Sequence, residues 1–225
     1  MSLTPDPSEP PRDCPRCPRL AALREDLRAT YPDWFNAPVP SFGDPEAWLA
    51  IVGLAPGMHG ANRTGRPFTG DHAGWLLYAT LSRFGLAEGV YAERPDDGLR
   101  LRGAIIINSV RCLPPQNKPT PAEIATCRSF LIPALAALPR LTTIIALGAI
   151  AHGSALRAYG LIPGRHKFAH EAEHRIPGGP LLIDSYHCSR YNQNTGRLTN
   201  AMFESVFARA IARHGSVIDP SHEMR

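Results

Sequence analysis

Four of the five cysteines fall into a pattern that could hold a metal ion or an iron–sulfur cluster. Cys14 and Cys17 form a C-x-x-C pair near the start of the chain. Cys112 follows an apolar run, and Cys127 lies in a segment with helical spacing. Four thiolates from separated segments can complete a tetrahedral zinc site or ligate a four-iron cluster. Because free cysteine is often a small core residue, burial of Cys112 and Cys127 is the alternative, and spacing alone leaves the choice open.

A second candidate is the glycine-rich segment from Gly53 to Asp71. Its glycines let backbone amides approach a ligand closely. It matches neither the G-x-G-x-x-G nor the G-x-x-x-x-G-K-[ST] nucleotide-binding motif. Asp71 is the only carboxylate in the segment, and it could also cap a helix that begins near Ala73. Phe68 could stack on a planar ligand or belong to the core.

The third candidate is the polar segment 185–197, which follows an apolar run. His187 is either a site residue or a hydrogen-bonded core histidine. Arg190 and Arg197, with Tyr191 and Asn192 between them, could be solvated surface residues. Their clustering also suits phosphate contacts and insertion into a nucleic-acid groove.

Two further segments give weaker signals. Residues 114–119 form a stiff polar loop close to Cys112. His166, His170 and His174 recur at four-residue steps, but they lie among Gly, Pro and Lys, so we expect surface histidines rather than a second metal site. A serine hydrolase is poorly supported because the chain has no G-x-S-x-G motif.

The elements that must position these residues alternate between strands and helices. Short apolar runs predict strands at 48–52, 104–108, 143–147 and 181–184. Helical spacing covers 18–30, 73–84, 121–138, 149–159 and about 200–213, and Thr120 with Glu123 predicts a capping box. This alternation predicts an α/β fold with a mainly parallel sheet. Ligands bind beyond the carboxyl ends of such strands, where the three candidate segments fall.

Composition and charge exclude some classes of protein. The 225 residues are 44% hydrophobic with a net charge of +4, which is compatible with a nucleic-acid partner but does not establish one. The longest uncharged run has 16 residues, too short for a membrane span, and no export leader is recognised. We expect a cytoplasmic protein with one domain at 14–215, a flexible lead-in at 1–13 and a tail at 216–225.

Together these motifs resemble the uracil-DNA glycosylase superfamily, in particular its iron–sulfur B-type branch, family 5. The resemblance extends in order over about residues 14–207. It rests on GLAPG at 53–57, HG at 59–60, NRTGRPFTGD at 62–71, VRC at 110–112, PPQNKPTP at 114–121, SYH at 185–187 and TGRLT at 195–199.

The resemblance implies a single-domain, three-layer α/β/α sandwich with a central four-stranded parallel sheet. It implies a [4Fe–4S] cluster on Cys14, Cys17, Cys112 and Cys127, and leaves Cys188 as an ordinary buried thiol. Enzymes of this kind flip a damaged nucleotide out of DNA and hydrolyse its N-glycosidic bond, leaving an abasic site. DNA containing uracil or related lesions is therefore the expected partner of a protein that we expect to be a monomer.

The same resemblance assigns roles to individual residues. The catalytic residues it implies are Asp71, which activates water, Asn117, which assists, and His187, which donates to the uracil O2 edge. Gly53, Ala55 and Gly57 line the base pocket, and Phe68 stacks on the base. The expected DNA contacts are Arg63, Arg190, Tyr191, Asn192 and Arg197.

One residue departs from the B-type pattern. Asn108 matches an Asn that reads the base in the related A type, where B-type members carry Ala. An amide there can pair with the Watson–Crick edge of uracil, so we expect a stronger uracil preference. Gly57 keeps open a non-catalytic iron–sulfur protein that binds uracil-containing DNA, and a zinc-stabilised hydrolase of small molecules is a third reading.

Overall fold

Four parallel strands form the centre of the fold. They are β2 (Leu49–Gly53), β5 (Ala104–Asn108), β6 (Thr143–Leu147) and β8 (Leu181–Ser185), in the spatial order β5-β2-β6-β8. The computed structural model describes residues 6–218. All four predicted strands and their parallel direction are confirmed. Every residue of β2 and β6 is buried, as expected where both faces of a parallel sheet are covered.

The sheet continues beyond these four strands. β1 (Phe42–Gly43) pairs antiparallel with β5, and β7 (Glu173–Arg175) pairs antiparallel with β8, so the sheet is mixed and six-stranded. The expected four-strand count was therefore incomplete. Edge strands of two or three residues are too short to show the alternation that identifies a strand in sequence. A separate two-stranded sheet joins β3 (Ala87–Glu88) to β4 (Arg100–Leu101).

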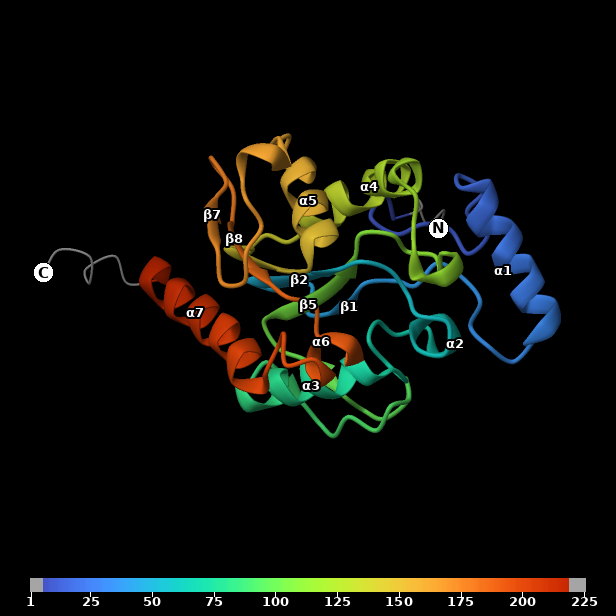
Figure 1. Cartoon of the computed structure of the whole chain (residues 1–225), viewed down its shortest axis with the longest axis horizontal. Helices are drawn as coiled ribbons and strands as arrows, with labels where there is room; N and C mark the ends of the chain where they lie inside the picture. The colour runs from blue at the N-terminus through green and yellow to red at the C-terminus, as the bar shows by residue number, and fades with distance from the viewer. Residues whose placement is uncertain (1–5, 219–225) are drawn as a thin grey trace, which may run out of the picture.

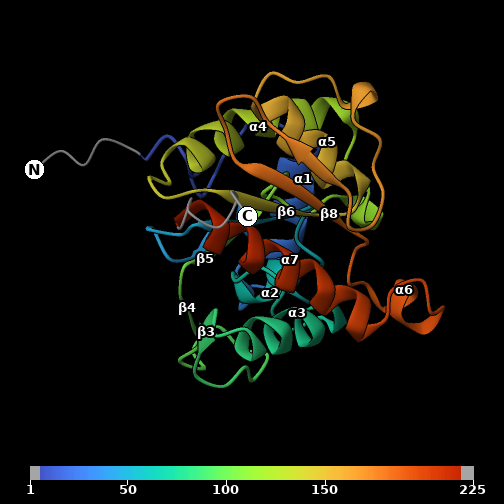
Figure 2. The same cartoon turned by 90° about the vertical axis from the view of Figure 1, so that its left-hand side faces the viewer.

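Helices cover both faces of the sheet (Figures 1 and 2). α3 (His72–Arg83) and α7 (Asn200–Ile218) lie on one face, and α4 (Pro121–Ala136) and α5 (Ala149–Ala158) on the other. The three-layer sandwich is thus confirmed. α1 (Pro18–Thr30) lies at one end, and the short helices α2 (Ala61–Thr64) and α6 (Arg190–Asn194) are in the loops. Single 3-10 turns occupy Pro115–Asn117 and Pro163–Arg165.

Alternate side chains of each strand build two separate cores. Ile51 and Ile145 pack with α3 and α7, whereas Val52 and Ala146 pack with α4 and α5. This alternation follows from the period of two in a strand. It places consecutive β8 residues on opposite faces, with Leu182 in the α4–α5 core and Ile183 in the α3–α7 core.

Local capping confirms another sequence prediction. The Thr120 hydroxyl accepts from Glu123 N at 3.2 Å, and the Glu123 carboxylate accepts from Thr120 N at 2.7 Å. Arg19 Nε and Nη2 donate to the two Glu123 carboxylate oxygens at 2.8 and 2.7 Å, and this ion pair joins α1 to α4. This fixes α1 beside the segment after β5. No helix within residues 6–218 is long and apolar enough to cross a membrane.

The expectation for the loop histidines is wrong for two of them. His174 lies in β7 with 9% of its side chain exposed, and its Nε2 lies 2.8 Å from the Asp184 carboxylate. His170 accepts from Tyr186 N at 3.2 Å and donates to Met202 O at 3.1 Å. Their partners lie in β8, directly after β8 and in α7, and only the tertiary fold brings them together, so the loop composition gave no sign of them.

Candidate active site

The loops that follow β2, β5 and β8 enclose one cavity of about 370 Å³. The strands end side by side here, and Gly53 of β2 is in register with Asn108 of β5. The cavity therefore lies at the edge where a parallel sheet binds ligands. It is lined by Leu54, Ala55, Gly57, Ala61, Phe68, Asp71, His72, Ala73, Asn108, Asn117, His187, Ser189 and Arg190.

Asp71 has both of the roles considered from the sequence. Its Oδ1 accepts from Gly74 N at 3.1 Å and so caps α3. Its other oxygen lies toward two glycines: a Cβ added to Gly60 would meet it at 2.6 Å, and one added to Gly57 at 3.7 Å. Burial raises the pKa of Asp71 above its ordinary value. The site thus holds a carboxylate with one oxygen used for capping and one facing the glycine-rich loop.

His187 lines the same cavity as Asp71. Its ring centroid is 6.0 Å from that of Phe68, with the planes 29° apart. Although the residue keeps some exposure through the cavity, burial among protein atoms lowers the pKa of His187 to about 4. The imidazole is therefore neutral near pH 7 and offers one N–H donor. Asn192 donates to the His187 backbone carbonyl at 2.8 Å and fixes this segment.

Asn108 contributes a buried amide to the cavity wall. The residue is 2% exposed, and among the described residues its Oδ1 has no hydrogen-bond partner. Buried polar atoms are almost always paired, so an unpaired one next to a cavity indicates a position for a ligand donor. Gly53 makes this position possible, because a Cβ there would lie 2.4 Å from Asn108 Oδ1 and 3.1 Å from the Phe68 ring.

Phe68 is presented by a strained segment. Its φ is +52°, a conformation that a bulky side chain adopts only when its surroundings impose it. Tyr78 donates to Pro67 O at 2.6 Å, and Tyr91 donates to Phe68 O at 3.1 Å. We call residues 66–70 the strap. These bonds hold the backbone of the strap while the Phe68 ring faces the cavity.

An ion pair anchors the start of the strap. Arg66 binds both oxygens of Asp97 at 2.7 Å, and their side chains are only 4% and 1% exposed. Arg66 also donates to the Thr69 hydroxyl at 2.7 Å. The guanidinium lowers the pKa of Asp97 far below that of an ordinary carboxyl. Asp97 is not predicted as a site residue, because nothing in the neighbouring sequence links it to Arg66, 31 residues earlier.

Asn117 reaches the cavity from a tight turn. Gln116 and Asn117 have φ values of +56° and +58°, and Asn117 N donates to Pro114 O at 3.0 Å. Asparagine tolerates this left-handed conformation better than most residues. Residues 114–119, the stiff loop predicted after Cys112, therefore bring the Asn117 amide to the cavity that Asp71 also lines.

Of the five expected DNA contacts, Arg190 lines the cavity and the other four are not among its lining residues. Arg190 is exposed at the cavity rim, and Tyr191 beside it is 71% exposed. Arg63 is also exposed. The exposed Arg197 guanidinium lies 4.7 Å from the Tyr186 ring centroid. Asn192 differs from the others, because its amide nitrogen is engaged inside the protein.

The four cysteines named as ligands line a second, smaller pocket. Cys14, Leu20, Val110, Cys127 and Phe130 form a small apolar cluster against which Cys17 and Cys112 pack. Arg111 N donates to Cys127 Sγ at 3.3 Å. Within residues 6–218, no three of these thiols lie within 4.8 Å of one another. Cys188 is fully buried elsewhere, as expected.

Comparison with known proteins gives one consistent family. The sequence model of the "Uracil DNA glycosylase superfamily" matches residues 40–210. A type-5 uracil-DNA glycosylase of Thermus thermophilus is 47% identical over 203 residues, covering 88% of this chain and 92% of that protein. One of Pyrobaculum aerophilum is 38% identical, covering 90% of each. A type-4 uracil-DNA glycosylase of Pyrobaculum aerophilum is 33% identical over 66% of this chain and 62% of its own.

Proposed function

The chain belongs to the uracil-DNA glycosylase superfamily, and from this membership we propose that it removes uracil from DNA by hydrolysing the N-glycosidic bond. It is an enzyme of base-excision repair that leaves an abasic site. The observation that carries this proposal is one cavity lined by a carboxylate, a neutral imidazole, a buried amide and an aromatic ring. These are the groups that binding and releasing a flipped uracil requires.

Binding of the base is assigned to Phe68 and Asn108. Flipping costs a few kcal/mol of unstacking, which contacts in the pocket must offset. The Phe68 ring supplies a stacking surface. Asn108 Oδ1, unpaired among the described residues, accepts the N3–H of uracil, and the amide nitrogen donates to O4. Ala55 and Gly57 line the pocket with small side chains, and Gly53 leaves room for Asn108 and the Phe68 ring.

Bond cleavage is assigned to Asp71 and His187. As the bond breaks, positive charge develops on the sugar and negative charge on uracil. Asp71 directs its free oxygen at the attacking water and stabilises the sugar cation, with Asn117 assisting from the facing turn. The neutral His187 donates its N–H to uracil O2, and a preorganised donor of this kind contributes about 3–4 kcal/mol. Gly57 has no side chain to compete with Asp71 for the water.

We further propose that Cys14, Cys17, Cys112 and Cys127 hold a [4Fe–4S] cluster. All four line one pocket, and thiolates suit such a cluster. The choice of iron over zinc rests on the resemblance to the iron–sulfur branch of the family. The cluster serves to tie α1 to α4 and to the segment after β5.

DNA is the proposed partner, contacted through Arg63, Arg190, Tyr191 and Arg197 around the cavity. Action as a monomer and a cytoplasmic location remain part of the proposal. No observation favours the non-catalytic alternative. Incubation with a DNA duplex that carries one uracil separates the two: the proposal expects free uracil and an abasic site, whereas tight binding without release would contradict it. Iron content and visible absorption test the cluster in the same preparation.

A further inference from the structure

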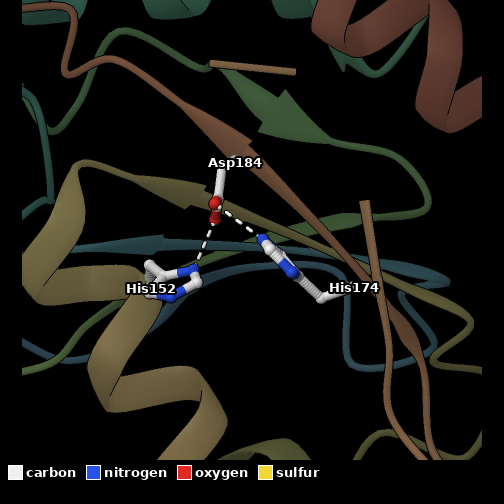
Figure 3. A group of neighbouring side chains, drawn as sticks. All are labelled: His152, His174 and Asp184. Atoms are coloured by element: carbon white, nitrogen blue, oxygen red, sulfur yellow. Dashed lines mark hydrogen bonds and ion pairs between the residues drawn. The ribbon is translucent and has the colours of Figure 1, made fainter. Parts of the chain in front are cut away.

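A buried group of three side chains lies on the α4–α5 face of the sheet, away from the proposed active site. It consists of His152 on α5, His174 on β7 and Asp184 on β8 (Figure 3). The Asp184 carboxylate points between the two rings, 2.8 Å from His152 Nδ1 and 2.8 Å from His174 Nε2. The side chains are 4%, 9% and 0% exposed in that order. All three facing atoms lie within 4.8 Å of one another.

The hydrogen bonds of His152 do not fit a neutral ring. Its Nδ1 faces Asp184 Oδ1, and its Nε2 lies 2.9 Å from the backbone oxygen of His166. A carboxylate and a carbonyl are both acceptors, and a neutral imidazole has only one N–H to offer. His170 shows the ordinary arrangement, with an N–H facing one ring nitrogen and a carbonyl facing the other. A hydrogen beyond those of a neutral ring and an ionised carboxylate, or a metal ion, must therefore lie between His152 Nδ1 and Asp184 Oδ1.

We propose that His152, His174 and Asp184 form a binding site for a divalent transition-metal ion such as Zn²⁺. Two imidazole nitrogens and a carboxylate are a ligand set that zinc commonly takes. Histidine ligands of metals almost always donate their second ring N–H to a carbonyl or carboxylate, which is what His152 Nε2 does toward His166 O. The buried negative charge of Asp184 supplies the compensation that a cation needs here. A water or the His166 ring, whose centroid is 5.7 Å from that of His174, completes the coordination.

The position of the site suggests a structural role. Its ligands come from a helix, an edge strand and a central strand, so one ion would fasten the three-residue strand β7 to α5 and β8. Asp184 precedes the proposed catalytic His187 by three residues. The ion would thus stiffen the end of the strand that leads into the active-site loop, without contacting the base or the DNA.

Zinc binding to the full-length protein tests this inference. After treatment with a chelator, titration with Zn²⁺ is followed by calorimetry for wild type, His174→Gln and His214→Gln. His174→Gln removes a ligand but keeps a donor to Asp184. His214 stacks on Trp48 at 4.0 Å, outside the group, and provides a matched control. We expect wild type and His214→Gln to bind one more equivalent of zinc than His174→Gln, with a zinc-dependent rise in Tm only in the first two.

A second measurement does not depend on how well the variant folds. X-ray absorption at the zinc edge of the wild-type protein should show nitrogen and oxygen neighbours. Equal zinc binding by wild type and His174→Gln, or a sulfur shell from the cysteine pocket, would overturn the proposal.

Discussion

Asp71 caps a helix and is also the proposed catalytic base. One carboxylate oxygen caps α3, and burial raises the pKa of the group above that of an ordinary carboxyl. For an acid, a raised pKa in the folded state means that ionisation costs folding energy. This cost is present above the folded pKa and disappears as the pH falls below it. The protein therefore maintains a destabilising charge where the proposed chemistry needs a base.

The pH dependence of uracil release should report this carboxylate. Only ionised Asp71 can direct water, so kcat/KM should fall as the pH drops through the raised pKa of Asp71, at a higher pH than an ordinary carboxyl would give. His187, with its pKa lowered to about 4, stays neutral over that range. Rates measured from pH 4.5 to 9 on uracil-containing DNA check this. An acid limb that persists unchanged in Asp71→Asn would assign it to another group.

Asn108 should set the base preference. Asn108→Ala removes the proposed hydrogen bonds to uracil and should lower kcat/KM on uracil about 5- to 150-fold, as the loss of about 1–3 kcal/mol implies. The free protein should lose little stability, because the amide oxygen has no protein partner to leave behind. Competition between uracil and other deaminated bases gives the readout. A variant that keeps the wild-type preference would show that Asn108 does not read the base.

At the scale of elements, the strap is held by contacts that join distant segments. Arg66 lies between Asp97 and the rings of Phe42, Tyr78 and Tyr91, whose centroids are 5.1, 5.5 and 5.8 Å from the guanidinium carbon. Removing one partner of such a buried pair leaves the other charge uncompensated. The strain at Phe68 persists because this surrounding structure imposes it.

Asp97→Asn should therefore destabilise the protein by about 3–5 kcal/mol and raise KM as the strap loosens around Phe68. Denaturant unfolding and steady-state kinetics measure the two effects. Glu88→Gln is the matched control, because it breaks an exposed ion pair with Arg102 whose side chains are 57% and 62% exposed, and stability should barely change. Equal effects of the two substitutions would contradict the role given to the strap.

The elements themselves were largely predictable, because each central strand and long helix has an apolar pattern of its own. Predicted bounds at 104–108 and 143–147 match β5 and β6. The edge strands β1 and β7 were missed because two or three residues carry no pattern. The cavity-lining residues were named through motifs that follow the strands, and the fold brings eight of them together. The pairing of Asp97 with Arg66, and that of Asp184 with His152 and His174, joins separate segments, and a local sequence pattern does not encode such pairings.

At the scale of the whole molecule, the cysteine pocket and the cavity are two separate sites. The cysteine pocket lies between α1, α4 and the segment after β5, and the cavity opens among the loops at the carboxyl end of the sheet. Glu9 pairs with the buried Arg111 at 3.3 Å, which attaches the segment before Cys14 to the same region. We propose that the exposed Arg190 at the cavity rim contacts a DNA phosphate, and such contacts supply affinity.

Arg190→Ala should weaken binding to uracil-containing and intact DNA alike, and lower the slope of log K against log salt by about one. The expected reason is the loss of one phosphate contact at the cavity rim. Arg102 precedes β5, at the opposite end of the strand from the cavity, so Arg102→Ala is the control. Fluorescence anisotropy over a range of salt concentrations measures the slope. An unchanged slope in Arg190→Ala would place Arg190 off the phosphate path.

Asp71 and His187 are the residues proposed to cleave the bond between uracil and the sugar. The direct test compares single-turnover uracil release by wild type, Asp71→Asn and His187→Ala on a duplex with one uracil, with folding and DNA affinity checked. We predict rapid release by wild type, losses of about a hundred- to ten-thousandfold in Asp71→Asn and about a hundredfold or more in His187→Ala, and retained DNA binding. Wild-type rates in both folded variants would contradict the account.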